Sequence, residues 1–280
     1  MIYYCINLVK NAERKQHMQN MAAQSGIDLI FFDAINGREL PQSTLEKHLD
    51  IARRTPRNIK NIWKQEFTPG EVGCALSNLS VWKSISEGPD KGAVILEDDV
   101  VFAADFKLIL NEIDQISTPN HLILLGGNTA HVYFNQGQAY SAQNASYLRY
   151  AGSRRLSNGN KIGVPIDRVW GAYAYWIGRE AAGKMVDYAQ HAFMVADQFT
   201  SESPLFGVRL WALNKPIVYP DFSFPSDLRE EHVHIQMANQ HKITPITKCL
   251  NIYRSIRRLF ISNYLKGEYA YLYEAPFSKA

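Results

Sequence analysis

The sequence contains little cysteine and no long apolar run. Three cysteines occur in 280 residues, and their wide separation fits neither a disulfide framework nor the ligand spacing of a zinc site. No stretch of about 18 uninterrupted apolar residues is present, which argues against a membrane-spanning helix. The first fifteen residues, MIYYCINLVKNAERK, are typical of a strand and a charged turn and not of a signal peptide. We therefore expect reduced thiols and a cytoplasmic location.

The charge of the chain is low but unevenly distributed. The formal net charge is +3, and 46% of the residues are hydrophobic, which is typical of a globular protein with a substantial core. Residues 241–280 carry seven Lys or Arg against two Glu, and their apolar residues recur near helical spacing. We expect this basic amphipathic C-terminal helical segment either to rest on an anionic membrane surface or to pack on the preceding domain, residues 1–240. The basicity is too modest to indicate nucleic-acid binding.

Strand-like and helix-like segments alternate along the domain, without internal repeats. The predicted strands are residues 2–8, 28–35, 93–100, 121–127, 172–178 and 216–220. The predicted helices are residues 11–26, 70–88, 104–115 and 179–189. Residues 41–66 show no clear periodicity and are expected to form a loop. Helices between short apolar strands favour an α/β fold with a mostly parallel central sheet and helices on both faces.

Three consecutive carboxylates follow one of the predicted strands. In AVILEDDV, residues 93–100, four apolar residues precede Glu97, Asp98 and Asp99. Ligands of open α/β sheets bind beyond the carboxyl ends of the strands, so we expect the acids at a ligand crevice. Alternation along an extended chain pairs Glu97 with Asp99 and turns Asp98 the other way. Such repelling charges favour a hard divalent cation, Mn²⁺ or Mg²⁺, although solvated acids at a strand end are the simpler alternative.

Two further groups of residues carry less specific signals. His232 and His234 alternate along EEHVHIQ, so His234 is a candidate third metal ligand, and exposed loop histidines are the alternative. The aromatic residues of WGAYAYW, residues 170–176, fit either a surface on which a sugar stacks or a strand that packs on both faces. Cys74 is interpreted as a small buried residue rather than a nucleophile.

Taken in order, six segments of the chain resemble glycosyltransferase family 25. This family contains bacterial sugar transferases that build lipooligosaccharide, and its relatives glycosylate collagen. The segments lie between residues 2 and 230 and are INLVKNAERKQHM, FFDAINGREL, FTPGEVGCALSN, VILEDDV, GAYAYWIGREAAGKM and PSDL. The chain departs from the family in the third segment, where Asn78 follows the serine in place of the usual histidine.

The resemblance implies a GT-A-like nucleotide-sugar-binding fold, a UDP-sugar donor, most often UDP-galactose, and transfer with inversion to a sugar hydroxyl. A metal that bridges the diphosphate stabilises the negative charge that grows as the glycosidic bond breaks. We assign Asp99 to direct metal ligation. Glu97 is assigned to the metal site or to contact with the ribose or a metal-bound water, and Asp98 is expected to orient this loop of the nucleotide-sugar site.

Inversion in a single displacement requires a general base that removes the proton of the attacking hydroxyl. The segment FMVADQFTSE supplies Asp197, and the resemblance places an acid at this point. We therefore predict that Asp197 is the catalytic base. The alternative is that Asp197 is the N-cap of the following helix, since aspartate is favoured at that position.

The remaining candidate nucleotide-sugar contacts lie on the first half of the chain. Asn7 and Arg14 follow the first strand and are candidates for contact with uracil or phosphate, as is Asp33 in the second. Arg14 alternatively is a solvated helix residue. Glu71 and Ser77 belong to the segment before the acidic strand, where Glu71 at a helix start is favourable for the helix dipole regardless of function.

The resemblance, together with these residues, implies an inverting, metal-dependent hexosyltransferase. Its donor would be a UDP-sugar, most often UDP-galactose with UDP-glucose as the alternative, and its acceptor a growing bacterial lipooligosaccharide. It would be cytoplasmic, with a peripheral position on the inner membrane if the C-terminal segment binds lipid. Two other classes remain as alternatives: a metal-dependent phosphoryl-transfer enzyme and a non-catalytic carbohydrate-binding module. No P-loop pattern or second acidic cluster supports the first of these.

Overall fold

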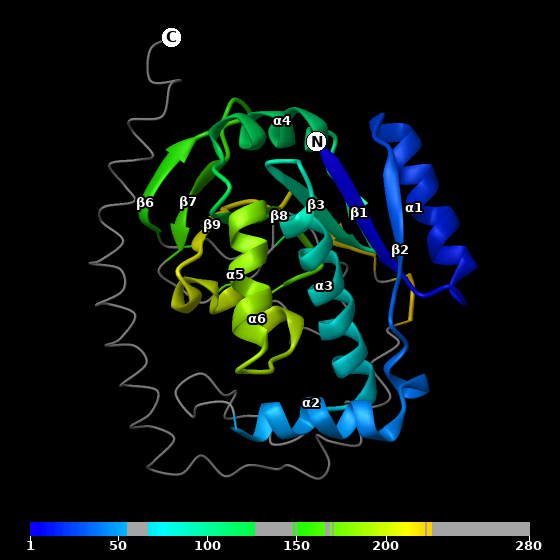
Figure 1. The fold of residues 1–280 in the computed structure, drawn as a ribbon. Helices are drawn as coiled ribbons and strands as arrows, with labels where there is room; N and C mark the ends of the chain where they lie inside the picture. Colours follow the sequence, from blue (N-terminus) through cyan, green and yellow to red (C-terminus); the bar gives the residue numbers. More distant parts are fainter. Residues whose placement is uncertain are drawn as a thin grey trace, which may run out of the picture.

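The fold was obtained as a computed structural model, which describes residues 1–54, 67–126, 148, 150–165, 169, 171–221 and 223–225. Its centre is an eight-stranded sheet with the order β2-β1-β3-β8-β5-β9-β7-β6, and β4 and β10 form a separate two-stranded sheet (Figure 1). The predicted segment 241–280, the domain boundary at residue 240 and His234 lie outside the described residues.

The first half of the sheet is parallel and supplies the edge at which the acids lie. β1 (Ile2–Asn7) pairs in parallel with β2 (Leu29–Asp33) on one side and with β3 (Gly92–Glu97) on the other. In this register Asn7 is opposite Asp33, and Ile6 is opposite Glu97. The three strands therefore end at the same edge. Because β3 is buried on both faces, its sequence GAVIL is continuously apolar.

The second half of the sheet is mixed. β8 (Ala174–Gly178) runs antiparallel between β3 and β5 (His121–Leu124), and β9 (Arg209–Leu213) lies parallel to β5. The remaining two strands, β7 (Lys161–Pro165) and β6 (Tyr150–Arg155), are antiparallel additions. Among the strands that the structure describes in this sheet, β7 and β8 alone oppose the common direction. The predicted mostly parallel sheet is thus confirmed.

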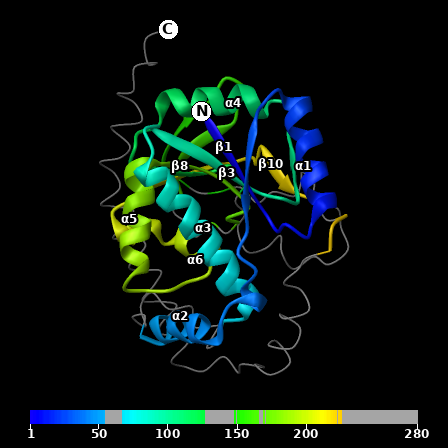
Figure 2. The same ribbon diagram turned by 45° about the vertical axis from the view of Figure 1, so that its right-hand side comes forward.

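Helices cover both faces of the sheet, as predicted. The helices α1 (Ala12–Ser25) and α4 (Phe106–Ile116) pack on one face through a core that includes Met18, Phe106 and Trp176. The other face is covered by helices that share a second core around Trp82 and Phe199. These helices are α3 (Pro69–Glu87), α5 (Arg179–Ala189) and α6 (Ala196–Ser201) (Figures 1 and 2).

The connecting elements differ from the prediction at two places. Residues 41–66 were expected to form a loop, but Gln42–Arg54 form α2, which crosses the N-terminal end of α3 (Figure 2). The hairpin of β6 and β7 was not predicted. The other short elements are η1 (Gly37–Glu39), β4 (Val100–Phe102), η3 (Ser203–Phe206) and β10 (Val218–Pro220). No helix within the described part of the chain is sufficiently long and apolar to span a membrane.

Candidate active site

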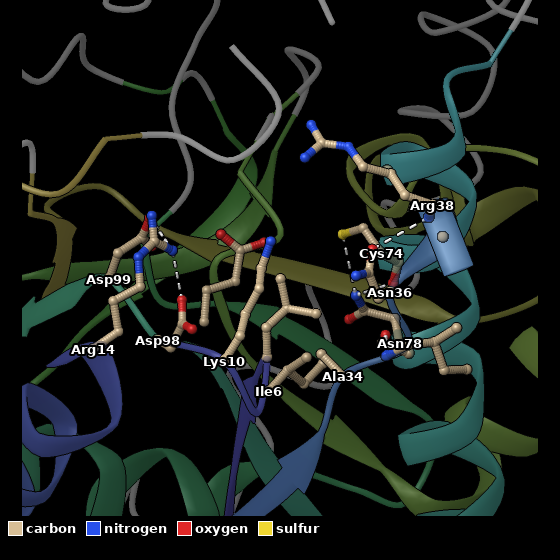
Figure 3. A pocket seen from close by; sticks show the side chains of 16 residues that line it. Ile6, Lys10, Arg14, Ala34, Asn36, Arg38, Cys74, Asn78, Asp98 and Asp99 are labelled. Atoms are coloured by element: carbon tan, nitrogen blue, oxygen red, sulfur yellow. Dashed lines mark hydrogen bonds and ion pairs between the residues drawn. The ribbon is translucent and has the colours of Figure 1, made fainter. Parts of the chain in front are cut away.

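A cavity lies at the edge where β1, β2 and β3 end. Its lining comes from the turns after β1 and β2, from the first turns of α3 and from the acidic turn that follows β3. Glu97 is the last residue of β3, and Asp98 and Asp99 form the turn before β4. All three acids line the cavity, so the expectation that they meet at a crevice agrees with the geometry (Figure 3).

Asp98 is held by two side chains that follow β1. Arg14 Nη1 donates to Asp98 Oδ1 at 2.7 Å, and Asn7 Nδ2 donates to Asp98 Oδ2 at 2.8 Å. The side chains of Arg14 and Asp98 are only 11% and 9% exposed. Arg14 is therefore not a solvated helix residue. Both oxygens of Asp98 are engaged by the protein, which suits an acid that orients the turn.

Arg14 also connects the acidic turn to the chain after β10. Its Nη1 lies 3.2 Å from Asp99 Oδ2, and its Nη2 donates to the Pro225 carbonyl at 2.6 Å. The Asp99 carbonyl accepts a hydrogen bond from the Asp221 backbone N–H at 2.6 Å. The guanidinium lies over the ring of Phe224, with 5.7 Å to its centroid. These contacts hold Asp221, Phe224 and Pro225 against the acidic turn.

Glu97 has a different electrostatic environment. Burial raises the pKa of its carboxyl well above the usual range, and the charges of Asp99, Asp197 and Asp98 raise it further, while Arg14 lowers it. The negative charge around Glu97 thus exceeds what the protein compensates. A hard divalent cation would remove this penalty, because carboxylate oxygens are its preferred ligands.

The metal prediction is only partly addressed by the geometry. Within the described residues, no cluster of three or more His, Cys, Asp or Glu side chains is arranged to hold a metal ion. A cation at Glu97 and Asp99 would therefore need oxygens of a ligand or water, which is the usual way in which Mg²⁺ is bound. The third predicted ligand, His234, lies outside the described residues.

Asp197 lies close enough to Glu97 for its charge to affect the Glu97 carboxyl. It is the second residue of α6, and the N-cap of that helix is Val195, whose side chain makes no capping bond. The alternative interpretation of Asp197 as the N-cap is therefore wrong. Instead, Asp197 Oδ1 accepts a hydrogen bond from the Ala172 backbone N–H at 2.6 Å, which fixes the carboxylate against the turn before β8.

The turn after β2 is packed directly on α3. A Cβ atom on Gly37 would lie 1.6 Å from the Pro69 carbonyl oxygen, and one on Gly73 would lie 2.5 Å from the Gly37 nitrogen, so neither position accommodates a side chain. Ser77 strengthens the contact, since its Oγ accepts from the Ile35 N–H at 2.8 Å and donates to the Gly73 carbonyl at 2.7 Å. Ser77 lines the cavity and holds this turn in place.

Three predicted nucleotide contacts do not line the cavity. Asn7 is the first of them, and its side chain holds Asp98 instead. Asp33 is exposed at the end of β2 and does not line it, while the neighbouring Asn36 does. Glu71 also does not line it. The Glu71 carboxylate accepts from the Thr68 N–H at 2.9 Å and its own N–H donates to Thr68 Oγ1, which makes a capping box. The helix-stabilising alternative for Glu71 is therefore the one that the geometry supports.

The sequence interpretation missed several residues that line the cavity. Lys10 and Arg38 bring positive charge to it, and Asn36 and Asn78 bring amides (Figure 3). Lys10 and Asn36 lie a few residues beyond the ends of β1 and β2. The turns that follow neighbouring parallel strands lie at the same edge of the sheet. Polar residues in these turns could therefore have been predicted to line the cavity.

Comparison with known proteins identifies the family of the chain. The profile of the family described as "Glycosyltransferase family 25 (LPS biosynthesis protein)" matches residues 1–200. The chain belongs to glycosyltransferase family 25. The family resemblance is thereby confirmed. Five of its six segments lie within the matched residues, and PSDL at 225–228 lies beyond them.

Relatives within the family come from animals and from bacteria. A glycosyltransferase 25 family member of Aedes aegypti is 34% identical over 105 residues, which cover 37% of this chain and 17% of the relative. Procollagen galactosyltransferase 2 of Homo sapiens is 31% identical over 127 residues, with 44% and 20% covered. A Haemophilus influenzae protein that carries a glycosyltransferase name is 29% identical over 144 residues, with 51% and 48% covered. The matches to the first two span about a fifth of their lengths.

Proposed function

We propose that this family 25 member is an inverting hexosyltransferase that moves galactose from UDP-galactose to a sugar hydroxyl of a growing bacterial lipooligosaccharide. The observation that carries the proposal is the excess of negative charge around Glu97, which lines the cavity with Asp99 where β1, β2 and β3 end. Asp197 is not among the lining residues, but its charge also acts on Glu97. A pure binding module has no need for half-buried carboxylates that repel one another.

The donor end of the reaction is assigned to the acidic turn. Asp99, with Glu97, would hold Mn²⁺ or Mg²⁺, and the cation would neutralise the charge that develops on the leaving diphosphate. Lys10 and Arg38 line the same cavity and add positive charge for the diphosphate. Asp98 contributes by holding the turn through Arg14 and does not need to touch the donor.

The acceptor end is assigned to Asp197. The Ala172 N–H binds one oxygen of its carboxylate and thereby fixes the orientation of the group. A general base must be held within hydrogen-bond reach of the proton that it removes, and such positioning favours this role. Asp197 lies on α6, and its charge acts on Glu97. As the base it would act from the side opposite the leaving group.

The choice of galactose rests on relatives. The procollagen galactosyltransferases of Homo sapiens and Xenopus laevis are 31% and 27% identical to the chain over the matched residues. Glucose differs from galactose in the configuration of one hydroxyl, so UDP-glucose is the alternative donor. Lipooligosaccharide is proposed as the acceptor because the bacterial enzymes that the sequence resembles build this glycan.

The proposal is tested by incubation of the full chain with a panel of UDP-, GDP- and CMP-sugars, truncated oligosaccharide acceptors and Mn²⁺, with products identified by mass spectrometry. We expect a hexose to be added from UDP-galactose only when the divalent cation is present. Cleavage of phosphodiesters without base preference would instead indicate phosphoryl transfer, and oligosaccharide binding without UDP affinity would indicate a carbohydrate-binding module.

We also propose a cytoplasmic location with peripheral attachment to anionic membrane through residues 241–280. The seven basic residues of this segment support it, because each contributes about 1 kcal/mol near an anionic surface. In a flotation experiment with anionic liposomes, the full chain should float with the lipid. A chain truncated after Thr247 should not. Equal binding of both forms would contradict the attachment.

A further inference from the structure

The α3 wall of the cavity carries a buried series of hydrogen-bonded side chains. Trp82 Nε1 donates to the Tyr175 hydroxyl at 2.7 Å, and that hydroxyl donates to Asn78 Oδ1 at 2.6 Å. Trp82 and Tyr175 are fully buried, and Asn78 is 2% exposed and lines the cavity. In Figure 3, Asn78 lies on the opposite side of the cavity from Asp98.

The direction of these hydrogen bonds is determined by the chemistry of their ends. An indole N–H only donates, so the Tyr175 hydroxyl accepts from Trp82 and has its single hydrogen left for Asn78. The atom of Asn78 that faces Tyr175 must then be the amide oxygen. At the other end Asn78 Nδ2 donates to the Cys74 carbonyl at 3.0 Å, and a carbonyl only accepts. Rotation of the amide by 180° would place donor against donor and acceptor against acceptor in a buried environment.

One N–H of the Asn78 amide remains for a ligand. The amide has two N–H groups, and the Cys74 carbonyl takes one of them. Among the described residues, the further partner of Nδ2 is the Cys74 sulfur at 3.9 Å, which is a weak acceptor. Asn78 therefore offers the cavity a fixed hydrogen-bond donor, and the ligand group that it suits is an acceptor oxygen.

Apolar side chains lie between this donor and the acidic turn. Ile6 at the end of β1 and Ala34 after β2 line the cavity, and Figure 3 shows both between Asp98 and Asn78. A flat nucleobase packs on such side chains, and its diphosphate would then extend toward the acids. We propose that Asn78 is a specificity-determining residue that donates to the O4 carbonyl oxygen of uracil, and that Tyr175 is a positioning residue that helps to fix the Asn78 amide. This inference rests on the proposed use of a UDP-sugar donor.

The base contact is tested by calorimetry of UDP and CDP binding in the presence of Mn²⁺. Uracil has a carbonyl where cytosine has an amino group, so a fixed donor favours UDP, by about tenfold for one hydrogen bond. Asn78→Asp replaces the donor with an acceptor and should reduce the UDP preference to about one. Tyr175→Phe removes one of the two hydrogen bonds that orient the amide and should narrow the preference while the site retains its shape. The matched control is Tyr150→Phe, because the buried Tyr150 hydroxyl has no partner within the described residues.

Each outcome has a defined meaning. A narrowed UDP to CDP ratio in Asn78→Asp and Tyr175→Phe, with the wild-type ratio in Tyr150→Phe, supports the inference. An unchanged ratio in a folded Asn78→Asp or Tyr175→Phe protein overturns it and leaves the proposed function standing. Failure of the wild-type protein to bind UDP overturns both. Thermal unfolding shows which variants are folded, and since both exchanges preserve side-chain size, either one alone decides the result.

Discussion

The two sides of the acidic turn differ in how their charge is compensated. On the α1 side, both oxygens of Asp98 accept hydrogen bonds, from Arg14 and from Asn7. On the cavity side, Glu97 is half-buried, and desolvation together with the charges of Asp99 and Asp197 raises its pKa. Adjacent residues of one motif thus have opposite roles. The compensated side fixes the turn, and the uncompensated side is where a cation and a reacting ligand are expected.

The largest effect is expected from Asp197→Asn. The exchange preserves the shape of the side chain but removes the basic oxygen, so transfer should fall by about a hundred- to ten-thousandfold. UDP binding should remain, because Asp197 is assigned to the acceptor side. Initial rates and calorimetry on the same preparation measure both quantities. A normal transfer rate would show that the base lies elsewhere.

Asp99→Ala should remove the dependence of transfer on divalent cations. The residual rate should be lower by about a hundredfold or more, since the charge of the leaving diphosphate is then unscreened. Titration of the rate with Mn²⁺ measures the effect. Asp187→Ala on the exposed face of α5 is the matched control and should behave as the wild type. Full activity of Asp99→Ala would contradict the assignment of Asp99 to the metal.

Asp98→Ala tests the side of the acidic turn on which the charge is compensated. It leaves the nearly buried guanidinium of Arg14 without its main partner, so the free energy of unfolding should fall by about 3 kcal/mol. Urea unfolding gives this value. The control is Asp50→Ala, which removes the partner of the exposed Arg53, and we expect no measurable loss there. Equal losses in the two variants would argue against a structural role for Asp98.

The smallest of these effects is expected for the stability of Glu97→Gln. This exchange should change how the free energy of unfolding depends on pH. Because the pKa of Glu97 is raised above its ordinary value of 4.5, the folded protein holds this proton more tightly than the unfolded chain. The free energy of unfolding without metal should therefore fall as the pH rises from 4.5 through the raised pKa. The variant should lack this fall in the free energy of unfolding. At a pH above the raised pKa of Glu97, the variant should therefore be more stable than the wild type. Parallel stability profiles for the two proteins would contradict the excess of charge at Glu97.

Much of the architecture was predictable because buried strands appear in the sequence as runs of apolar residues. The apolar strand before Glu97 and its neighbours at the sheet edge were predicted from hydrophobic runs, and the acids do lie at the cavity. The helix α2 was missed although Leu45, Leu49 and Ala52 recur at helical spacing and pack under α3. Polar and charged residues outnumber apolar ones in QSTLEKHLDIARR, so the apolar face of this helix is narrow.

The site was less predictable because single turns decide which side chains reach it. Asp33 and Asn36 are three residues apart, but only Asn36 lines the cavity, since the close contact of Gly37 with α3 turns the chain there. For Glu71, the Thr68 to Glu71 spacing of a capping box was visible in the sequence and explains its burial. The contact of Asn78 with Tyr175 joins residues far apart in the chain and has no local pattern.

The central claim is that the carboxylates of Asp99 and Glu97 bind a divalent cation together with the diphosphate of the donor. Crystals of the full chain soaked with Mn²⁺ and UDP test it most directly, because anomalous scattering locates manganese independently of the protein atoms. We predict one anomalous peak in contact with the Asp99 carboxylate and adjacent to Glu97, bridged to the diphosphate. UDP bound in the cavity with manganese elsewhere, or with no manganese, would contradict the account.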